Sequence, residues 1–261
     1  MTFALGPRAS SAGYRLVVFD RIGSTNSEAM DAARSGDRGP IWFVTSEQTA
    51  GRGRRQRPWI APRGNLAASV LETLDVSPAI AATLGFAAGL ALEAALRTVA
   101  GSGAAFSLKW PNDVLSGQAK LAGILLEAEA APKGGLSIVV GMGTNIIAAP
   151  EGTPTPATSL KTLGLDTTAE TLFAALSDSW AEIRSLWGKG RGFPEIRRRW
   201  LALAAGLGGP VAVQTGNATI SGTFDTIDES GCLVVTTATG ARIPVSAGDV
   251  HFGSIASVGA G

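Results

Sequence analysis

Residues 48–59 constrain this chain most, because they place four arginines in a glycine-rich segment directly after an apolar run. The segment reads Gln-Thr-Ala-Gly-Arg-Gly-Arg-Arg-Gln-Arg-Pro-Trp, and no carboxylate occurs between Glu47 and Glu72. The apolar residues 41–44 predict a strand, so the segment is expected to be a loop that leaves it. Glycines let backbone N–H groups approach a ligand, and guanidinium groups match phosphate or carboxylate oxygens. We therefore expect this arginine loop (residues 48–59) to hold an anion, with a solvated basic loop or a nucleic-acid patch as alternatives.

The overall charge argues against a nucleic-acid partner. Lysines and arginines number 22 against 21 acidic residues, so the net charge is only +1. A length of 261 residues with 45% hydrophobic content suits one large domain, or a large domain followed by a small one. The single cysteine, Cys232, excludes an intramolecular disulfide and a multi-thiolate metal site. The single histidine, His251, is expected at the surface and not in catalysis.

The hydropathy pattern predicts neither a signal peptide nor a membrane-spanning segment. Residues 1–14 are small and polar without an apolar signal core, and we expect a flexible arm. The longest uncharged apolar-rich stretch, residues 77–92, is shorter than the roughly 20 residues that span a bilayer. We therefore expect a cytoplasmic protein without a membrane partner.

The order of the predicted elements divides the chain after residue 207. Strands are predicted at residues 16–19, 66–71, 120–126 and 136–140. Helices are predicted at residues 25–35, 78–99, 167–187 and 194–205, with the apolar stripe of the third in the core. Beyond a glycine-rich stretch, short Val/Ile/Thr runs alternate with turn residues at 211–215, 218–227, 232–238 and 241–245. This spacing predicts a small β-barrel.

Three further polar clusters accompany the arginine loop. The first is Ser24-Thr25-Asn26, where Thr25 and Glu28 predict a capping box and the hydroxyls could also bind a polar group. The second is the Trp-Pro-Asn-Asp turn at 110–113, flanked by Lys109 and Lys120. A lysine that opens an apolar strand is costly unless its ammonium meets an anion, so Lys120 is a candidate for phosphate or carboxylate binding.

Within the turn, Asp113 is the candidate ligand for Mg²⁺, a hard cation that prefers oxygen; a turn-forming role is its structural alternative. The third cluster, Gly-Met-Gly-Thr-Asn at 141–145, lacks the third glycine of a dinucleotide loop, and the chain contains no P-loop. We expect its glycines to pack against a purine, with Asn145 offering amide hydrogen bonds.

In their order and spacing, these four motifs resemble those of the biotin protein ligases, the biotin–[acetyl-CoA-carboxylase] ligases, over residues 15–252. The resemblance implies an α+β fold: a mixed β-sheet flanked by helices, like that of class II synthetases, followed by an SH3-like β-barrel. The implied division is a flexible arm (1–14), a biotin- and ATP-binding catalytic domain (15–207) and the barrel (208–255). Bifunctional members carry an N-terminal helix-turn-helix domain; only about fourteen residues precede the first strand here, so we expect no repressor function.

The resemblance also implies a two-step reaction. The biotin carboxylate attacks the α-phosphate of ATP, which gives biotinyl-5′-AMP and pyrophosphate. The ε-amine of one lysine of the biotin carboxyl carrier protein then attacks the activated carbonyl and releases AMP. Expected ligands are biotin, ATP and Mg²⁺, and a homodimer is compatible with the resemblance.

Carried over residue by residue, the resemblance makes Lys120 and Arg54 the catalytic residues. The residues implied to bind biotin are Ser24, Thr25, Asn26, Gln48, Gly51, Arg52, Gly53, Arg54, Trp59 and Lys120. The residues implied to bind ATP are Arg52, Arg54, Lys109, Asn112, Asp113, Lys120 and Asn145, with Asp113 on the metal. No general base for the acceptor lysine is evident.

One departure and two rival interpretations accompany the resemblance. The family's loop usually has a glycine where this chain has Gln56, which puts the kinetics of loop closure in question. Lipoate–protein ligase, an enzyme of the same fold, is the nearest competitor, and the loop and the barrel favour biotin over it. A nucleic-acid-binding module leaves the motifs around Lys109 and Lys120 unexplained.

Overall fold

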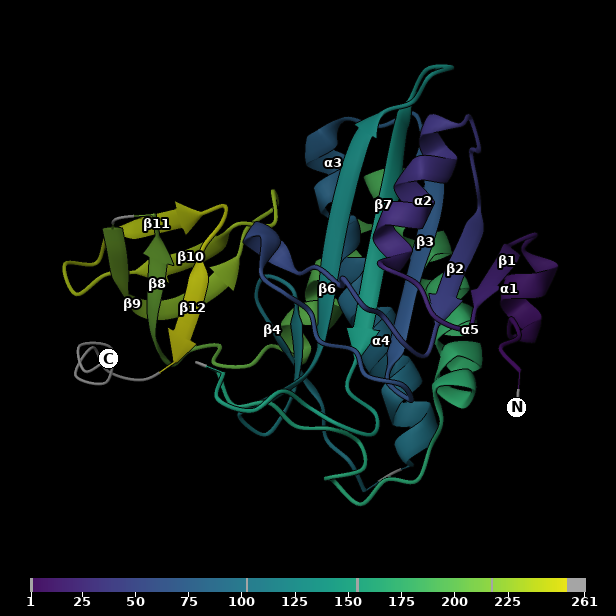
Figure 1. The fold of residues 1–261 in the computed structure, drawn as a ribbon. Helices are drawn as coiled ribbons and strands as arrows, with labels where there is room; N and C mark the ends of the chain where they lie inside the picture. The colour runs from purple at the N-terminus through teal and green to yellow at the C-terminus, as the bar shows by residue number, and fades with distance from the viewer. Residues whose placement is uncertain (1, 102, 154, 217, 253–261) are drawn as a thin grey trace.

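The computed structural model describes residues 2–101, 103–153, 155–216 and 218–252. Two β-sheets organise these residues, one of seven strands and one of five (Figure 1). Helices cover both faces of the larger sheet, whereas the smaller sheet lies beside the β4 end of the larger one (Figure 1). The predicted α+β class is confirmed.

The seven-stranded sheet is mixed, as predicted. Its strands are β1 (Arg15–Phe19), β2 (Ile41–Thr45), β3 (Leu66–Leu74), β4 (Ser107–Lys109), β5 (Asp113–Ser116), β6 (Ala119–Ala130) and β7 (Leu136–Thr144). They lie in the order β1-β2-β3-β7-β6-β5-β4, with β1 and β2 parallel and all other neighbours antiparallel. The long strands β6 and β7 therefore run through the centre of the sheet.

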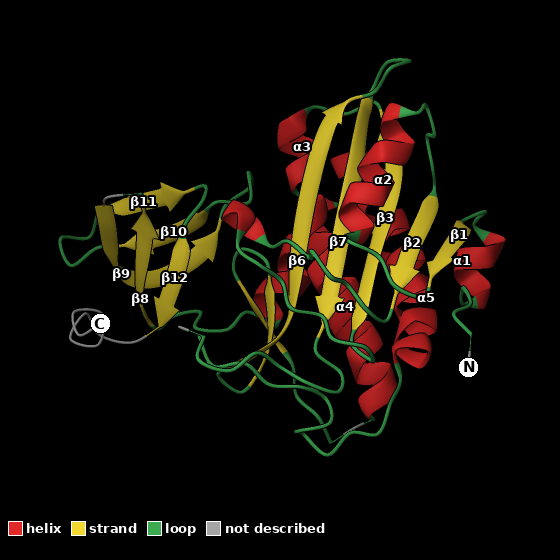
Figure 2. Ribbon diagram, in the orientation of Figure 1, coloured by secondary structure: helices red, strands yellow, loops and turns green. Residues whose placement is uncertain are grey.

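Helices cover the two faces of this sheet unequally (Figure 2). The α-helices are α1 (Pro7–Ser11), α2 (Thr25–Arg34), α3 (Pro78–Ala82), α4 (Leu84–Ala100), α5 (Ala169–Trp187) and α6 (Phe193–Ala202). Helix α2 packs on one face against β2, β3 and β7, and α4 and α5 pack on the other. The 3₁₀ turns are η1 (Arg54–Gln56) and η2 (Gly188–Gly190).

Successive side chains of β2 contribute alternately to the cores on the two faces of the sheet. Ile41 and Phe43 contribute to the small core under α2, whereas Trp42 and Val44 belong to the large core on the opposite side. All five β2 residues are buried, because successive side chains of a strand point to opposite faces and both faces are covered here.

The stripe predicted for residues 167–187 is confirmed as core. Its members are Leu172, Leu176, Trp180, Ile183 and Trp187, and all are buried. Helix α5 packs them against α4, so the two helices form one layer behind the sheet.

The helix predicted at residues 78–99 is present as α3 and α4, which together cover residues 78–100. Among the described residues it is 23 residues long and apolar enough, by length and composition alone, to cross a bilayer. The uncharged stretch at 77–92 is shorter than this, and the helix gains its length by continuing through Glu93 and Arg97. Its surroundings explain the composition: 72% of its most apolar window is buried inside the protein. It is a core helix.

The prediction that residues 1–14 form a flexible arm is wrong for the part that the structure describes. Phe3 is buried and meets Phe173 of α5 edge to face, with ring centroids 5.8 Å apart. In α1 the backbone N–H of Ala9 donates to Asp178 Oδ1 at 3.0 Å. One aromatic anchor and a few satisfied backbone groups hold a segment that composition alone describes as loose.

The C-terminal unit is the predicted small barrel-like sheet with one strand more than expected. Its strands are β8 (Pro210–Thr215), β9 (Ala218–Ile227), β10 (Leu233–Thr236), β11 (Arg242–Val245) and β12 (Asp249–Phe252), in the order β11-β10-β9-β8-β12 and all antiparallel. The added strand, β12, pairs with β8. Residues 253–255 of the predicted domain lie outside the described residues.

Candidate active site

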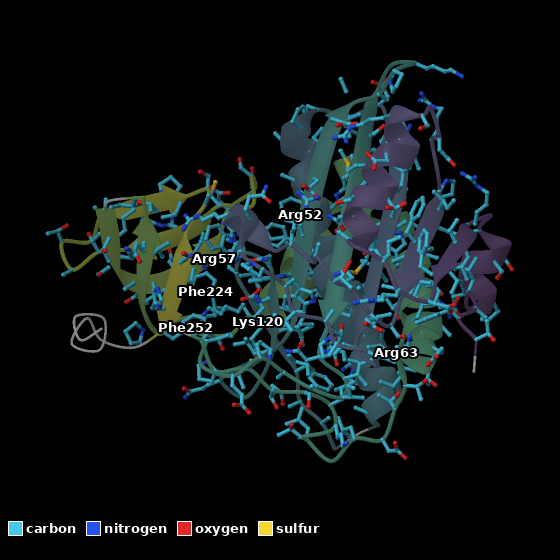
Figure 3. The ribbon with its side chains drawn as sticks, in the orientation of Figure 1. Arg52, Arg57, Arg63, Lys120, Phe224 and Phe252 are labelled. Carbon is cyan, nitrogen blue, oxygen red and sulfur yellow. The ribbon has the colours of Figure 1, made fainter. Side chains whose placement is uncertain are left out.

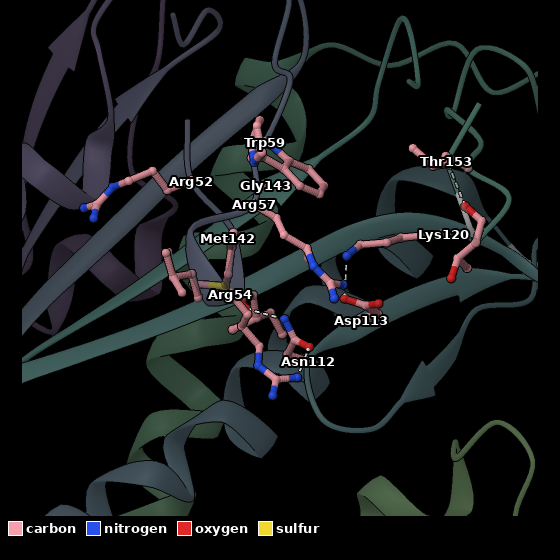
Figure 4. Close-up of a pocket in the computed structure, with 18 of the residues that line it drawn as sticks. Arg52, Arg54, Arg57, Trp59, Asn112, Asp113, Lys120, Met142, Gly143 and Thr153 are labelled. Carbon is pink, nitrogen blue, oxygen red and sulfur yellow. Dashed lines mark hydrogen bonds and ion pairs between the residues drawn. The ribbon is translucent and has the colours of Figure 1, made fainter. Parts of the chain in front are cut away.

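A cavity of about 620 Å³ lies between the large sheet and the barrel (Figure 4). Its walls come from the arginine loop, the turn at 110–113, strands β6 and β7, the loop after β7, and β12 of the barrel. Predicted site residues that line it are Ser24, Thr25, Asn26, Gln48, Arg52, Gly53, Arg54, Trp59, Lys109, Asn112, Asp113, Lys120 and Asn145.

Gly51 is the predicted site residue that does not line the cavity. A Cβ atom at Gly51 would lie 2.4 Å from the carbonyl oxygen of Trp59 and 2.7 Å from Gln48 Nε2. The backbone N–H of Trp59 donates to the Gly51 carbonyl oxygen at 2.9 Å, and this hydrogen bond closes the loop on itself. The glycine is required because the loop backbone passes too close for a side chain.

The polar end of the cavity is the N-terminus of α2. Ser24, not Thr25, caps this helix, because the Ser24 Oγ accepts from the Ser27 N–H at 3.4 Å. The predicted capping box at Thr25 and Glu28 is therefore wrong, and the N-cap lies one residue earlier, at Ser24. Thr25 instead donates from its N–H and its hydroxyl to Gln48 Oε1, at 2.8 and 3.0 Å. A hydroxyl and an amide from separate elements are thus fixed together at a helix N-terminus, where partial positive charge gathers.

The glycines of the 141–145 cluster contact protein groups, whereas we expected a purine. A Cβ at Gly141 would lie 2.0 Å from Asn26 Oδ1, and one at Gly143 would lie 2.5 Å from the Trp59 ring. Gly123 pairs with Gly143 across β6 and β7 and also faces the Trp59 ring. Two paired glycines therefore form a slot in the sheet that the indole fills.

Asn26 lines the cavity and is held by its own hydrogen-bond partners. Its Nδ2 donates to Glu127 Oε2 at 2.8 Å, and its Oδ1 accepts from Ser69 Oγ at 2.6 Å. The side chain is buried, so these bonds fix its orientation.

Lys120 on β6 meets an anion within the protein, and its predicted role in ligand binding stays a prediction. Its Nζ lies 2.7 Å from Asp113 Oδ1, and the side chains are 27% and 17% exposed (Figure 4). The Lys120 ammonium also lies 5.5 Å from the centroid of the Trp59 ring. The partner in the described chain is Asp113, so the carboxylate predicted to bind metal is already engaged by a cation.

Positive charge dominates the cavity wall. Five lysine or arginine side chains line it, against the two carboxylates of Asp113 and Asp249. Burial lowers the pKa of Arg54, although Asp249 and Asp113 oppose this effect. Burial also lowers the pKa of Lys109, with Asp113 opposing it. Cations that are partly desolvated and outnumber their counter-charges favour an anionic ligand.

Asn112 connects the arginine loop to the central strand β6. Its Nδ2 donates to the Ile124 carbonyl at 2.7 Å, and its Oδ1 accepts from Arg54 at 3.3 Å (Figure 4). The preceding Trp110–Pro111 peptide bond is cis. Asn112 and Asp113 both line the cavity, where Asp113 contacts Lys120.

The tip of the arginine loop has a backbone conformation that favours glycine. Arg55 and Gln56 both have left-handed backbone conformations, with φ of 55° and 60°. This region costs an L-residue other than glycine about 1–2 kcal/mol. Gln56 therefore occupies a conformation that glycine adopts freely.

Comparison with known proteins assigns the chain to a family. Residues 18–145 match the biotin/lipoate A/B protein ligase family, and residues 206–253 match the biotin protein ligase C-terminal domain. A biotin–[acetyl-CoA-carboxylase] ligase of Paracoccus denitrificans is 38% identical over 239 residues, which cover 89% of this chain and 98% of the relative. The chain belongs to the biotin protein ligase family.

Two further relatives agree with this assignment. A biotin–[acetyl-CoA-carboxylase] ligase of Mycobacterium tuberculosis is 35% identical over 247 residues, covering 93% of this chain and 90% of the relative. A solved biotin protein ligase from Aquifex aeolicus, in complex with biotin and ATP, superimposes with a TM-score of 0.77 over 92% of this chain and 99% of that one. At 24% identity, the last comparison establishes the shared fold.

The barrel wall of this ligase's cavity was missed from sequence. Gln214, Gly248, Asp249, Val250 and His251 all line the cavity. His251, expected as an ordinary surface residue, is half-buried in that wall. These residues lie more than 90 positions from Lys120 in a different sheet, so no motif spacing could connect them to the site.

Asn65 is a second residue that sequence analysis missed. It is buried, and its Oδ1 accepts from the backbone N–H groups of Ile146, Ile147 and Ala148 at 2.9, 3.0 and 3.3 Å. Its Nδ2 donates to the Ala148 carbonyl at 2.8 Å. One side chain thus shapes the loop after β7, which forms part of the cavity wall.

Proposed function

We propose that this cavity binds biotin and ATP side by side, joins them as biotinyl-5′-AMP, and transfers biotin to one lysine of a biotin carboxyl carrier protein. The observation that carries the proposal is the meeting of Lys120, Arg54 and Asn112 at one cavity in a member of this family. A volume of about 620 Å³ is in the range of small-molecule sites.

In the first step a biotin carboxylate oxygen attacks the α-phosphorus of ATP, and the bond to the leaving pyrophosphate breaks. Negative charge on the α-phosphate oxygens grows in the transition state. The ammonium of Lys120 and the guanidinium of Arg54 are prepositioned cations that stabilise this charge. Lys120 then exchanges its contact with Asp113 for the substrate oxygens.

In the second step the carrier lysine's amine attacks the carbonyl carbon of biotinyl-5′-AMP. The bond to the phosphate oxygen breaks, AMP leaves and an amide forms. The amine must lose a proton, and holding amine and carbonyl together supplies much of the acceleration in such reactions. Because ATP is a substrate, we place the reaction in the cytoplasm.

The polar end at α2 suits the head group of biotin. Ser24, Thr25 and Gln48 present hydroxyl and amide groups there, matching a ureido ring that both donates and accepts. Trp59 presents an apolar face for the remaining ring atoms, above the slot at Gly143. Asn26 supports this end through Ser69 and Glu127.

The opposite end suits the nucleotide. Lys109 adds positive charge for phosphates to that of Arg54, whereas Arg52 contacts Ser27 at the α2 end. Asn145 is buried, and its Oδ1 has no hydrogen-bond partner among the described residues. A buried acceptor without a partner is rare, and the exocyclic amine of adenine would satisfy it.

The donor set fits a magnesium ion that arrives with the nucleotide. No group of three or more His, Cys, Asp or Glu side chains that could hold a metal occurs in the part of the chain that the structure describes. Mg²⁺ in nucleotide sites commonly takes one or two carboxylates and completes its shell with phosphates and water. Asp113 would hold such an ion, whose charge would help to neutralise the phosphates.

The direct test incubates the protein with ATP, Mg²⁺, biotin and a carrier domain, and follows the mass of the carrier. We expect one biotinyl group on one lysine, and no comparable gain when lipoate replaces biotin. Transfer of lipoate at an equal rate would contradict the choice of substrate.

Lys120→Ala tests the site itself. Loss of a fixed cation at the reacting centre should slow biotin-dependent pyrophosphate exchange by about 10²–10³-fold. Lys133→Ala, which removes an exposed lysine, is the matched control and should leave exchange unchanged. Near-normal exchange in a folded Lys120→Ala protein would sink the assignment.

A further inference from the structure

The four arginines of the arginine loop contact two different parts of the protein (Figure 3). Arg52 reaches the catalytic domain, where it donates to Ser27 Oγ at 3.2 Å. Arg55 and Arg57 reach the barrel instead, and Arg54 contacts both Asn112 of the catalytic domain and Gly248 of the barrel. Only the barrel side therefore offers this loop a connection between domains.

That connection centres on the carboxylate of Asp249, at the start of β12. Its Oδ2 accepts from Arg55 at 2.8 Å and from Arg57 at 2.6 Å. Arg54 donates to the neighbouring Gly248 carbonyl at 3.4 Å. Figure 1 shows η1, the turn that carries Arg54 and Arg55, between the barrel and β6.

The barrel presents Asp249 rigidly. Val250 next to it is buried in the barrel core, so Asp249 points outward from the strand. Burial acts to raise the pKa of Asp249, but the hydrogen bond from Arg57 and the charges of Arg57, Arg55 and Arg54 outweigh it and lower the pKa. The carboxylate is therefore ionised and poised to pair.

Hydrogen bonds within the arginine loop tie the positions of its arginines to one another. The Gly53 N–H donates to the Arg57 carbonyl at 2.8 Å, and the backbones of Arg52 and Pro58 form an antiparallel β-bridge. Together these contacts make a small hairpin. Fixing Arg55 and Arg57 at one side of this hairpin thus fixes the position of Arg54, which lines the cavity.

We propose that Asp249 is a positioning residue, a latch on the barrel that holds the arginine loop over the cavity and retains the activated intermediate there. The retention role rests on the proposed function; the latch itself does not. Arg54 forms no ion pair within the described residues, so the latch leaves its charge available to a substrate anion.

The test compares Asp249→Asn, which keeps the shape and removes the charge, with Asp225→Asn as a matched control. Asp225 pairs with Arg242 at 2.7 Å in the same barrel, and neither residue lines the cavity. Hydrogen–deuterium exchange of residues 48–59 without substrate should accelerate about tenfold in Asp249→Asn and stay unchanged in Asp225→Asn.

With ATP and biotin present, labelling of a bystander protein by escaped biotinyl-5′-AMP should also rise about tenfold relative to the rate of intermediate formation. Asp249→Glu should restore retention, and high salt should narrow the difference from wild type, because the ion pairs are partly exposed. If Asp249 had a purely structural role, Asp249→Asn would lower the melting temperature of the barrel without raising escape relative to intermediate formation.

Arg55→Gln breaks the same contact from the loop side, at a residue that does not line the cavity. It should raise loop exchange by part of the Asp249→Asn effect and add little in the double variant. If Asp249→Asn fails to fold, Arg55→Gln carries the test. Unchanged exchange in residues 48–59 would overturn the latch; faster exchange without faster escape would overturn retention. Absence of any biotinyl-5′-AMP from wild type would overturn the proposed function alone.

Discussion

Replacing Gly143 by alanine would test whether the glycine slot positions Trp59. The added Cβ would lie 2.5 Å from two atoms of the indole, Cε2 and Nε1. Carbon contacts are optimal at about 3.5–4.0 Å, so the ring would have to withdraw by about 1 Å. Ordinary overpacking of this kind costs about 1–3 kcal/mol.

The size of the effect should follow the geometry across a graded series. At Gly123 the added Cβ would lie 3.2 Å from the Trp59 ring, so Gly123→Ala should be milder than Gly143→Ala. At Gly85 in α4 no atom lies within 4 Å, so Gly85→Ala is the control. It should be neutral or stabilising by up to about 1 kcal/mol, because alanine favours helix.

Two measurements check the reasoning. The first is the free energy of unfolding from denaturant titration. The second is biotin affinity by calorimetry, where displacement of the indole should raise the Kd of Gly143→Ala about tenfold, or about 1.4 kcal/mol. Both effects arise from the same withdrawn ring.

A double-mutant cycle with Trp59→Ala isolates the contact. Without the indole, Gly143→Ala should lose most of its cost, giving a coupling free energy of about 1–2 kcal/mol in unfolding. Additivity of the two substitutions within about 0.5 kcal/mol would refute the idea that the glycine exists to seat this ring.

Two further substitutions probe the frame around the site. Asn65→Ala would remove the acceptor of the backbone N–H groups of residues 146–148, of which that of Ile146 is buried, so unfolding should become easier by about 1–3 kcal/mol and ATP affinity should fall. Asn65→Asp, which keeps the acceptor, should do less, and an equal loss would contradict this explanation. Burial raises the pKa of Glu93, against the charge of Arg97, so the folded state holds its proton more tightly and loses stability as pH rises through that pKa. Glu93→Gln should therefore raise the melting temperature more at pH 8 than at pH 3, and an equal change at both would refute the assignment.

The parts of the site that sequence could predict are those encoded within single motifs. Ser24, Lys120 and Asn145 each lie at the edge of an element whose hydrophobic pattern is strong, so both the element and its polar end were predictable. Strands β4 and β5 were missed, since three or four residues beside a proline carry little periodicity. Helix α1 was missed because its stability comes from contacts with α5.

Contacts between distant segments were not predictable in this way. Asp113 was predicted as a metal ligand next to Asn112, and only the folded structure shows its carboxylate 2.7 Å from the Lys120 ammonium across β5 and β6. Asp249 lies at the start of a short strand in another sheet, with no local feature that distinguishes it from a surface carboxylate. Such roles become visible only when the chain is folded.

Gln56 is a local departure in sequence whose consequence depends on a contact with a distant segment. A glycine at this position would adopt the left-handed conformation without cost, whereas Arg55 and Gln56 together oppose it by about 2–4 kcal/mol. Strained residues persist where surrounding contacts over-determine them. The contacts that join this tip to the barrel include the ion pairs of Arg55 and Arg57 with Asp249. The departure at position 56 and the carboxylate on β12 are therefore coupled: a loop that resists its closed shape depends more on the barrel to hold it.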